Sequence, residues 1–325
     1  MTTQSIELRH TFDEKVYGKR LDLALSETFE EYSRSRIQDW VKQGFVKVND
    51  EVITSNKHKM AGFELVEVNA EVEVAGDWEA EAIELNIVYE DDDLLVVNKP
   101  TGLVVHPGAG NQQGTMVNAL LHHVPELQNL PRAGIIHRLD KETTGLLVVA
   151  KTIGAHTSLV DQLQKREFTR EYDALVNRVM VSGNSIDAPI GRHPTKRTAM
   201  AVIPDGRRAI THFRVAEKFL DHTHLKLRLE TGRTHQIRVH MSYLKFPIVG
   251  DPLYSGRYRV PNRITPELKE ILGKFKRQAL HASLLGLKHP TTGDYIEWTA
   301  SMPADMQKLR DALVANREHF SNLEE

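Results

Sequence analysis

Two segments near the start of the chain, 18–25 and 33–44, carry apolar residues at helical spacing. Their apolar faces consist of Leu21, Ala24 and Leu25 in the first segment and of Ile37, Trp40 and Val41 in the second. Ser35 followed by Gln38 is the pattern of a capping box, and Gly44 suits the end of a helix. The pattern therefore predicts two short amphipathic helices.

Residues 45–53 alternate between apolar and polar positions, which is typical of a pair of strands. Asn49 and Asp50 lie at the centre of this run and predict its turn. We assign the helices and the hairpin to one small domain, residues 1–75. Residues 76–86 are acidic and lack apolar periodicity, so we expect a linker there.

The rest of the chain combines many strand-like runs with fewer helical ones. The strand-like runs are 87–89, 93–100, 145–150, 170–176, 211–215 and 223–230, and helical spacing is clearest at 112–123 and 155–165. Strands and helices do not alternate regularly, so we expect an α+β fold with a mainly antiparallel mixed sheet. We assign residues 87–312 to this domain and residues 313–325 to a C-terminal tail that begins as a fraying helix.

Charge is distributed unevenly in a chain whose formal net charge is only −2. Residues 76–93 hold eight acidic side chains and no Lys or Arg, whereas residues 191–240 hold eleven Lys or Arg against four Asp or Glu. Such asymmetry predicts a basic surface for a polyanion. A solvated basic face without a ligand is the alternative that charge alone leaves open.

Composition excludes several classes of protein. The chain has no cysteine, and hence no disulfide framework and no thiolate metal site. No run approaches the roughly 18 apolar residues of a membrane helix, and the first residues lack the order of a signal peptide. We therefore expect a cytoplasmic protein that does not enter a membrane.

A loop of polar and ionisable residues, 137–145, lies between an apolar strand end and the apolar run 146–150. Such residues between two buried strands mark a candidate site. Arg138 and Lys141 flank Asp140 and should stabilise its anion, which suits a nucleophile or base near neutral pH. A salt bridge within the loop is the alternative.

Other chemistries lack their motifs. None of the sixteen histidines forms an H-x-x-x-H or H-x-x-E-H pair, so we expect no metal site. The glycines of residues 106–111 are not followed by the Lys-Ser/Thr of a P-loop, and there is no G-x-S-x-G elbow.

Residues 137–146, HRLDKETTGL, match at every position the signature HRLDK-x-T-[ST]-G-L of the RluA-type pseudouridine synthases, and the chain resembles that family. Further blocks follow in the family's order at 98–107, 170–175, 229–240, 277–282 and 289–290. The resemblance covers nearly the whole chain and departs at Ser255, where a glycine is usual. It implies the α+β fold of that family and a reaction without cofactor or metal.

Residues 18–74 resemble the S4 RNA-binding domain. The matching residues are Arg20-Leu21-Asp22, Ser33-Arg34-Ser35, Gly44 and Val46-Lys47-Val48-Asn49, with Asp50 in place of the usual glycine. The resemblance implies that Arg34, Arg36 and Lys42 contact RNA phosphates, which position an RNA more than they select its sequence. In the basic stretch, we expect further RNA contacts from Arg192, Lys196 and Arg197.

The family's reaction breaks the N1–C1′ bond of a uridine, rotates the uracil and joins its C5 to C1′. The resemblance gives Asp140 the role of nucleophile at C1′ or base at C2′, gives Arg233 the role of its ion-pair partner, and makes Tyr172 the platform for a base that has left the stack. Further substrate contacts are expected from His137, Arg138, Leu139, Lys141, Thr143, Arg238 and Lys99. From the residues alone, Tyr172 could be a core tyrosine and Arg233 a turn residue paired with Glu230.

Residues 106–111 and 192–198 resemble most closely the family members that act on large-subunit (23S) ribosomal RNA. We therefore expect 23S rRNA or a pre-50S particle as the partner of a monomeric enzyme. The alternatives are the same chemistry on another rRNA site or on tRNA, and a non-catalytic RNA-binding assembly factor, which would show a degenerate signature loop. A glycoside hydrolase would need a second carboxylate, and Glu142 is the only acid close in sequence.

Overall fold

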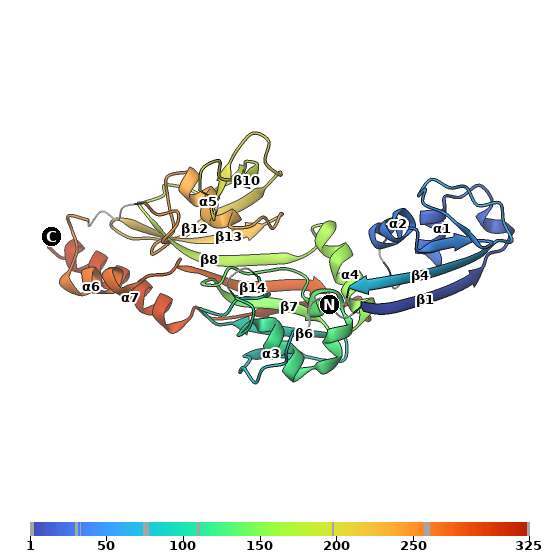
Figure 1. The fold of residues 1–325 in the computed structure, drawn as a ribbon. Helices are drawn as coiled ribbons and strands as arrows, with labels where there is room; N and C mark the ends of the chain where they lie inside the picture. Colours follow the sequence, from blue (N-terminus) through green and yellow to red (C-terminus); the bar gives the residue numbers. More distant parts are fainter. Residues whose placement is uncertain are drawn as a thin grey trace.

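The computed structural model describes residues 3–29, 32, 34–73, 78–108, 111–196, 198–256 and 261–323. It shows a small N-terminal unit and a larger unit, each built around its own sheet (Figure 1). Their buried apolar side chains form separate clusters. In the described part, no helix has the length and apolar character needed to cross a membrane.

The small unit is a four-stranded sheet in the order β1-β4-β2-β3, with two helices packed on it. Its elements are β1 (Thr3–Thr11), the 3-10 helix η1 (Glu14–Val16), α1 (Leu21–Thr28), α2 (Arg34–Lys42), β2 (Val46–Val48), β3 (Glu51–Val52) and β4 (Leu65–Glu73). Both predicted apolar faces are buried, with Leu21 and Val41 at 0 % exposure. Asn49 and Asp50 have φ of 47° and 68°, as the predicted hairpin turn requires.

The capping-box interpretation of Ser35 and Gln38 is wrong. Helix α2 begins at Arg34, so Ser35 lies inside it, and the Gln38 Nε2 donates to Asp22 Oδ2 at 2.6 Å. Burial alone would raise the pKa of Asp22, but hydrogen bonds from Gln38, Arg20 and Arg34 hold this pKa below its usual value. A buried carboxylate therefore ties together the starts of the two helices.

The larger unit contains a nine-stranded sheet in the order β5-β6-β7-β14-β8-β13-β12-β9, with β15 paired to β14. The strands are β5 (Ile87–Glu90), β6 (Leu94–Lys99), β7 (Thr144–Ala150), β8 (Thr169–Asn177), β9 (Asn184–Asp187), β12 (Ile210–Lys218), β13 (His222–Leu229), β14 (Leu280–Lys288) and β15 (Tyr295–Thr299). Of the ladders described in this sheet, only that of β7 with β14 is parallel. The expected mainly antiparallel α+β sheet is confirmed.

Helices and a small second sheet cover this large sheet. They are α3 (Met116–His123), η2 (Pro125–Asn129), η3 (Pro131–Gly134), α4 (Ile153–Gln164), β10 (Ile190–Arg192), β11 (Met200–Val202), α5 (Gln236–Tyr243), α6 (Pro266–Lys274) and α7 (Ala304–Ser321). Apolar residues of β6 and β7 alternate between two clusters, one shared with α3, α5 and α7 and the other with α4. Because both faces of β7 are covered, all seven of its residues are buried.

Several boundaries differ from the expectation. The helix expected over 112–123 begins at Met116, behind a capping box of Thr115 and Asn118. Helix α7 runs without interruption through the expected start of the tail, and Leu313 and Asn316 are 1 % and 4 % exposed, so the expected boundary at residue 313 falls within a packed helix. Residues 78–86 have no regular structure, as expected of a linker, but Trp78 and Leu85 pack against the core of the larger unit.

Candidate active site

The signature loop lies where the only described parallel pair of the large sheet begins. Thr144 and Gly145 of β7 face His281 and Ala282 of β14. Gly145 has a φ of 113°, and a side chain there would overlap the backbone of Ala282. A glycine is thus required where β7 approaches β14 so closely, and the loop that precedes it lies at the end of these two strands.

A lysine holds this loop from behind. The Nζ of Lys99, at the end of β6, donates to the carbonyl oxygens of Pro100, Leu103 and Lys141 at 2.8, 2.9 and 2.9 Å. Lys99 is 0 % exposed, and burial lowers its pKa to about 8, so the ammonium still dominates at pH 7 with all three hydrogens used. Lys99, which was expected to contact substrate, thus holds the loop and is not among the residues that line the cavity described below.

Thr143 also faces inward. Its side-chain oxygen accepts a hydrogen bond from Gln278 Nε2 at 3.0 Å, and its amide donates to the carbonyl of Asp140 at 3.0 Å. At 2 % exposure, this threonine shapes the turn after Asp140, and its hydroxyl is already engaged by the protein.

Asp140 receives its ion pair from helix α5. Arg238 Nη1 donates to Asp140 Oδ2 at 2.8 Å, while the other carboxylate oxygen, Oδ1, lies 3.9 Å from His235 Nε2, beyond hydrogen-bond distance. Asp140 is thus held at one oxygen and has the other available.

The ion pair predicted between Arg233 and Asp140 is not present among the described contacts. Arg233 Nε donates to the carbonyl of Arg208 at 3.1 Å. Nor does Arg233 pair with Glu230, whose described ion pairs are with Arg166 and His212. Arg233 lies before the first turn of α5, whereas Arg238 lies within the helix and reaches inward.

A second carboxylate fixes Arg238. The Nε and Nη2 of Arg238 donate to the two oxygens of Asp251 at 2.7 and 3.0 Å. Asp251 is fully buried, and its Oδ1 also accepts from the backbone amides of Leu253 and Tyr254. Carboxylates on both sides raise the pKa of Arg238 even though burial acts against this. The guanidinium is a fixed cation rather than a mobile substrate contact.

His235 completes this side of the site. The Tyr254 hydroxyl accepts from the Met200 amide at 2.8 Å, which leaves its hydrogen to donate to His235 Nδ1 at 2.7 Å. Burial lowers the pKa of His235, although the Asp140 carboxylate acts against this shift. The neutral ring then carries its hydrogen on Nε2, facing Asp140.

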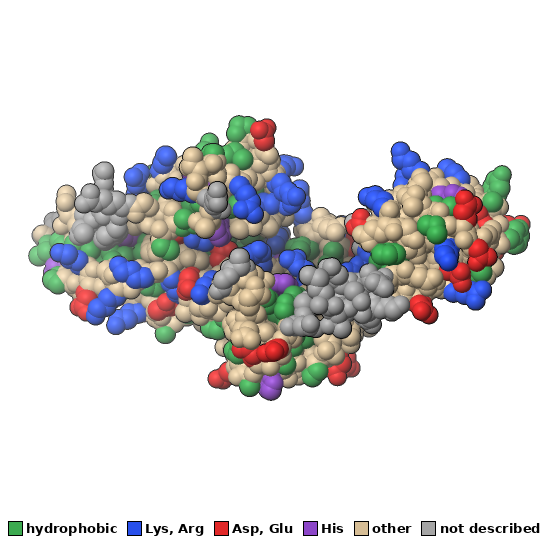
Figure 2. Space-filling model, viewed as in Figure 1, with side chains coloured by type: hydrophobic (Ala, Val, Ile, Leu, Met, Phe, Trp, Pro, Cys, Tyr) green, Lys and Arg blue, Asp and Glu red, His purple; other side chains and the backbone are tan. Residues whose placement is uncertain are grey.

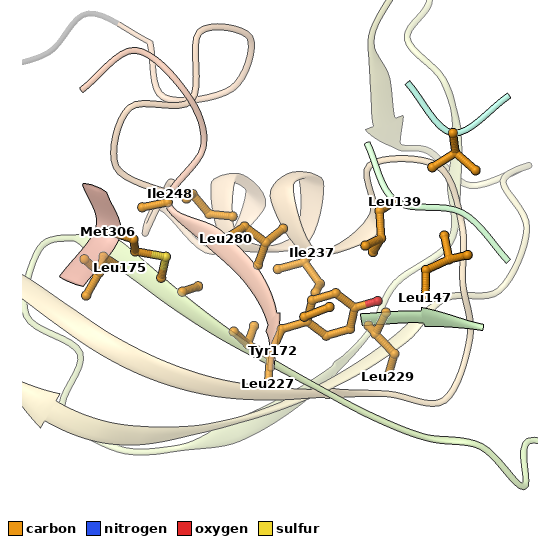
Figure 3. Packing of buried hydrophobic residues seen from close by; sticks show 14 of the residues in the cluster. Leu139, Leu147, Tyr172, Leu175, Leu227, Leu229, Ile237, Ile248, Leu280 and Met306 are labelled. Atoms are coloured by element: carbon orange, nitrogen blue, oxygen red, sulfur yellow. The ribbon is translucent and has the colours of Figure 1, made fainter. Parts of the chain in front are cut away.

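Tyr172 comes from the middle of β8 and is 5 % exposed. Figure 3 shows its ring among Leu139, Leu229 and Ile237, which explains why Leu139 of the signature loop is buried. Burial raises the pKa of Tyr172, and the Asp140 carboxylate adds to this. The phenol is therefore neutral at pH 7.

His137 is also uncharged. Burial and the positive charge of Arg170 lower its pKa to about 3. Its Nε2 accepts a long hydrogen bond, 3.4 Å, from the amide of Val148 in β7. This interaction positions the start of the signature loop against the sheet.

The signature loop, part of β8 and the start of α5 line one cavity of about 1070 Å³. Of the residues expected at the site, it contains Asp140, Tyr172, Arg233, His137, Arg138, Leu139, Lys141, Thr143 and Arg238. Seven Lys or Arg but only three Asp or Glu side chains line it, so it suits a polyanion. Lys and Arg side chains also gather on the surface over α5 and β10 (Figure 2). Among the described residues, no group of three or more His, Cys, Asp or Glu is placed to hold a metal.

The residues expected to bind RNA elsewhere lie on the surface. Arg34 is paired with Asp22 at 3.0 Å but keeps 46 % of its side chain exposed, and Lys42 is 63 % exposed. Arg36 is partly buried, and both Arg192 and Lys196 are exposed. Arg197 lies outside the described residues.

Sequence reasoning missed Asp251, Tyr254 and Gln278, which hold the active groups in place, and Arg170, which lines the cavity. Asp251 and Tyr254 belong to the segment 250–256, which signals a site only through its likeness to the family. Arg170 stands two positions before Tyr172, and strand alternation places both on one face of β8.

Comparisons with known proteins give the family to which the chain is similar. The family model for RNA pseudouridylate synthase matches residues 93–243, and the S4 domain model matches residues 19–60. The chain is 53% identical over 98% of both sequences to ribosomal large subunit pseudouridine synthase D of Vibrio parahaemolyticus. It is 54% identical over the same shares to the protein of that name from Yersinia pestis.

Solved structures are similar as well. Human RNA pseudouridylate synthase domain containing 4 has a TM-score of 0.53 and 26% identity, covering 69% of this chain and 93% of its own. Human RNA pseudouridylate synthase domain containing 1 has a TM-score of 0.53 and 27% identity, covering 73% of this chain and 97% of its own.

Proposed function

This chain belongs to the RNA pseudouridylate synthase family, and we propose that it isomerises uridines to pseudouridine in large-subunit ribosomal RNA. The observation that carries the proposal is Asp140, fixed by Arg238 at one oxygen and open to a basic cavity at the other. The names of its relatives support the large-subunit substrate.

The contacts of Asp140 support a choice of reacting atom. Oδ2 of Asp140 is occupied by Arg238, so Oδ1 is the oxygen that attacks C1′ of the ribose or takes the proton from C2′. Either route breaks the N1–C1′ bond, and the electron pair of that bond leaves with the uracil. After rotation, C5 of the uracil bonds to C1′. In the first route this displaces the aspartate from C1′, and in the second C2′ takes back the proton that Asp140 removed. C5 then loses its proton and N1 gains one, which restores aromaticity without any redox step. Arg238 holds the carboxylate in position throughout through its hydrogen bond to Oδ2.

Tyr172 and the cavity account for the flipped nucleotide. A neutral aromatic ring that is supported by Leu229 and Ile237 offers a flat apolar face to an unstacked base. Arg138 and Lys141 are exposed beside Asp140 and suit the phosphates on either side of the target. Arg233 lines the cavity and is not paired with Asp140 among the described contacts, so we propose that it contacts RNA.

A glycoside hydrolase fits the cavity less well, because its other acids are engaged by the protein. Glu142 Oε2 accepts from Thr101 at 2.7 Å, and Glu230 is paired with Arg166 and His212. A glycoside hydrolase needs a second available carboxylate, and neither Glu142 nor Glu230 is as available as Asp140 Oδ1.

We also propose how the chain is divided and where it acts. Residues 1–75 form the S4-like unit, residues 76–86 connect it to the catalytic unit, and the catalytic unit extends from residue 87 through the end of α7. The S4-like unit adds RNA affinity through Arg34, Arg36 and Lys42. The monomer acts in the cytoplasm on 23S rRNA, free or in a pre-50S particle.

Mapping pseudouridines in the ribosomal RNA of cells that lack this protein tests the proposal. We expect specific pseudouridines of large-subunit rRNA to disappear and to return when the wild-type chain is supplied. The Asp140→Asn chain should not restore them. An unchanged large-subunit map, or loss of pseudouridine only from tRNA, would contradict the proposed substrate.

A further inference from the structure

Arg170 is a buried cation in the cavity that the reaction described above does not use. It is 5 % exposed, lines the cavity and shares a face of β8 with Tyr172. Its Nε is buried and has no hydrogen-bond partner in the described part of the chain. No ion pair of Arg170 is found among the described residues, and the groups with which its charge interacts, Tyr172 and His137, are neutral.

The other buried arginines show how unusual this is. Arg238 and Arg277 have side-chain exposures of 7 % and 8 %, and each binds a carboxylate through two nitrogens, Asp251 and Asp305 respectively. A buried charge without a partner costs several kcal/mol, and a guanidinium does not escape that cost by losing its proton. Arg170 therefore destabilises the folded chain without a ligand, and a bound ligand that accepts hydrogen bonds from the guanidinium would offset this cost.

The surrounding chain leaves room for this guanidinium. A Cβ at Gly232 would lie 3.0 Å from Arg170 Nη1, closer than such atoms normally approach. Gly232 does not have a positive φ, so its backbone does not demand glycine. The missing side chain instead gives the guanidinium space at the cavity wall between β8 and the Arg233 turn.

We propose that Arg170 is a further catalytic residue, which donates to the carbonyl oxygens of the flipped uracil and stabilises the negative charge that the ring carries after the N1–C1′ bond breaks. This inference rests on the proposed function. The electron pair of the broken bond spreads from N1 onto O2 and O4, and an unpaired guanidinium at the wall of the cavity is suited to that anion. A carboxylate partner would cancel this effect.

Depth in the cavity favours the base over a phosphate as the ligand. Arg138, Lys141 and Arg166 are exposed and lie where a backbone can reach them, whereas Arg170 is buried beside the tyrosine that supports the base. A flipped ring can enter such a position, and the backbone phosphates stay at the rim.

The test compares the wild-type chain with Arg170→Met, using a 23S rRNA fragment with uridine or 5-fluorouridine at a mapped target. Loss of the N-glycosidic nucleoside is followed in single turnovers by mass spectrometry. We expect Arg170→Met to slow uridine cleavage on the order of 100-fold, the usual effect of removing one donor to a developing anion, with Kd within about threefold. Fluorine makes the uracil a better leaving group. The ratio of the wild-type rate to the Arg170→Met rate should therefore be several-fold smaller for 5-fluorouridine than for uridine.

Thermal unfolding distinguishes this role from a structural one. Removing an unpaired buried charge should leave the Tm of Arg170→Met equal to or above that of the wild type. Arg277→Met should lower the Tm, because it removes the pair with Asp305 and the donors to the carbonyl oxygens of Glu142 and Gln278. A lowered Tm for Arg170→Met would mean that the residue supports the fold, and it would overturn the proposal.

The kinetic outcomes are equally decisive. The assignment would be overturned if Arg170→Met cleaved uridine within threefold of the wild-type rate, or if its rate fell equally for both nucleosides. It would also be overturned if only Kd weakened and its salt dependence decreased, since that would indicate a phosphate contact. Wild-type activity in the same assay tests the proposed function separately. An inactive wild-type chain would overturn both, and an active one with an unaffected variant would overturn only the role of Arg170.

Discussion

At the scale of single residues, the site depends on which of two nearby arginines reaches Asp140. Arg233 and Arg238 stand in one sequence block, and both have the chemistry of an ion-pair partner. Only the start of α5 after His235, with Arg238 on its inward face and Asp251 behind it, decides between them. Sequence identified Asp140 and Tyr172 through short motifs, but it could not rank arginines whose contacts depend on a helix orientation.

Exchanging each arginine for glutamine separates their roles. Arg238→Gln strands the buried Asp251 and releases Asp140, so we expect about 3 kcal/mol of lost stability, typical of a broken buried pair, and a rate loss on the order of 100-fold or more. Arg233→Gln, as the matched control, should change stability by less than about 1 kcal/mol and act mainly on RNA affinity. Denaturant unfolding and single-turnover rates check both, and the reverse ranking would restore Arg233 as the partner.

His137 gives a prediction about pH. Its pKa falls to about 3 in the folded state from the ordinary value of 6.5, so the unfolded chain binds the extra proton between these values. Its contribution to stability is therefore complete above about pH 6.5 and decreases as the pH falls toward 3.

Replacing His137 by glutamine should flatten this dependence. Between pH 6.5 and 4.5 we expect the wild type to lose roughly 1–2 kcal/mol more of its unfolding free energy than the variant does, after allowance for partial exposure. Replacing His319, which is exposed on α7, provides the control and should leave the slope as in the wild type. Parallel curves for His137→Gln and wild type would contradict a His137 that stays neutral in the folded chain.

At the scale of elements, six of the nine described strands of the large sheet were predicted from their sequence pattern, whereas β9, β14 and β15 were not. Fully apolar runs such as β6 and β7 are recognised from sequence because both of their faces are buried. Strand β1 was missed, since its pairing with β4 is distant in sequence and its own alternation is weak. The anchoring of the signature loop was missed as well, because Lys99, Arg277 and Gln278 reach it from other strands and loops.

Replacing Lys99 by methionine tests that anchoring. Three carbonyl oxygens lose their donor, so we expect a stability loss of about 3 kcal/mol and a lower kcat with little change in KM, because Asp140 is displaced while the RNA contacts remain. The control is Lys288→Met, which replaces an exposed lysine at the end of β14 and should leave the stability, kcat and KM unchanged. A raised KM with unchanged kcat would instead support the original assignment of Lys99 to substrate binding.

At the scale of the whole molecule, two separate cores carry separate tasks. The small unit packs around Leu21, Ile37 and Val41, and the buried carboxylate of Asp22 joins its helices. Composition and the S4 resemblance predicted this unit because its pattern is local. The long C-terminal helix was predicted only in part, since its burial depends on the sheet and on α6.

Removing residues 1–77 should leave a folded catalytic unit that binds RNA more weakly. Loss of contacts from Arg34, Arg36 and Lys42 should reduce the slope of log Kd against log salt by about 2, at roughly 0.7 per phosphate contact. Circular dichroism checks the fold, and filter binding over a salt series gives the slope. An unchanged slope with a folded unit would contradict the RNA-binding role of the small unit.

The most direct measurement of the central claim is tritium release from a 23S rRNA fragment that carries uridine tritiated at C5. We expect release with the wild-type chain and with Asp161→Asn, an exposed acid on α4. Asp140→Asn, which keeps the shape of the side chain, should lower the rate at least about 1000-fold with Kd within about threefold. Release by Asp140→Asn at more than a tenth of the wild-type rate would contradict the assignment of Asp140 as the group that starts the reaction.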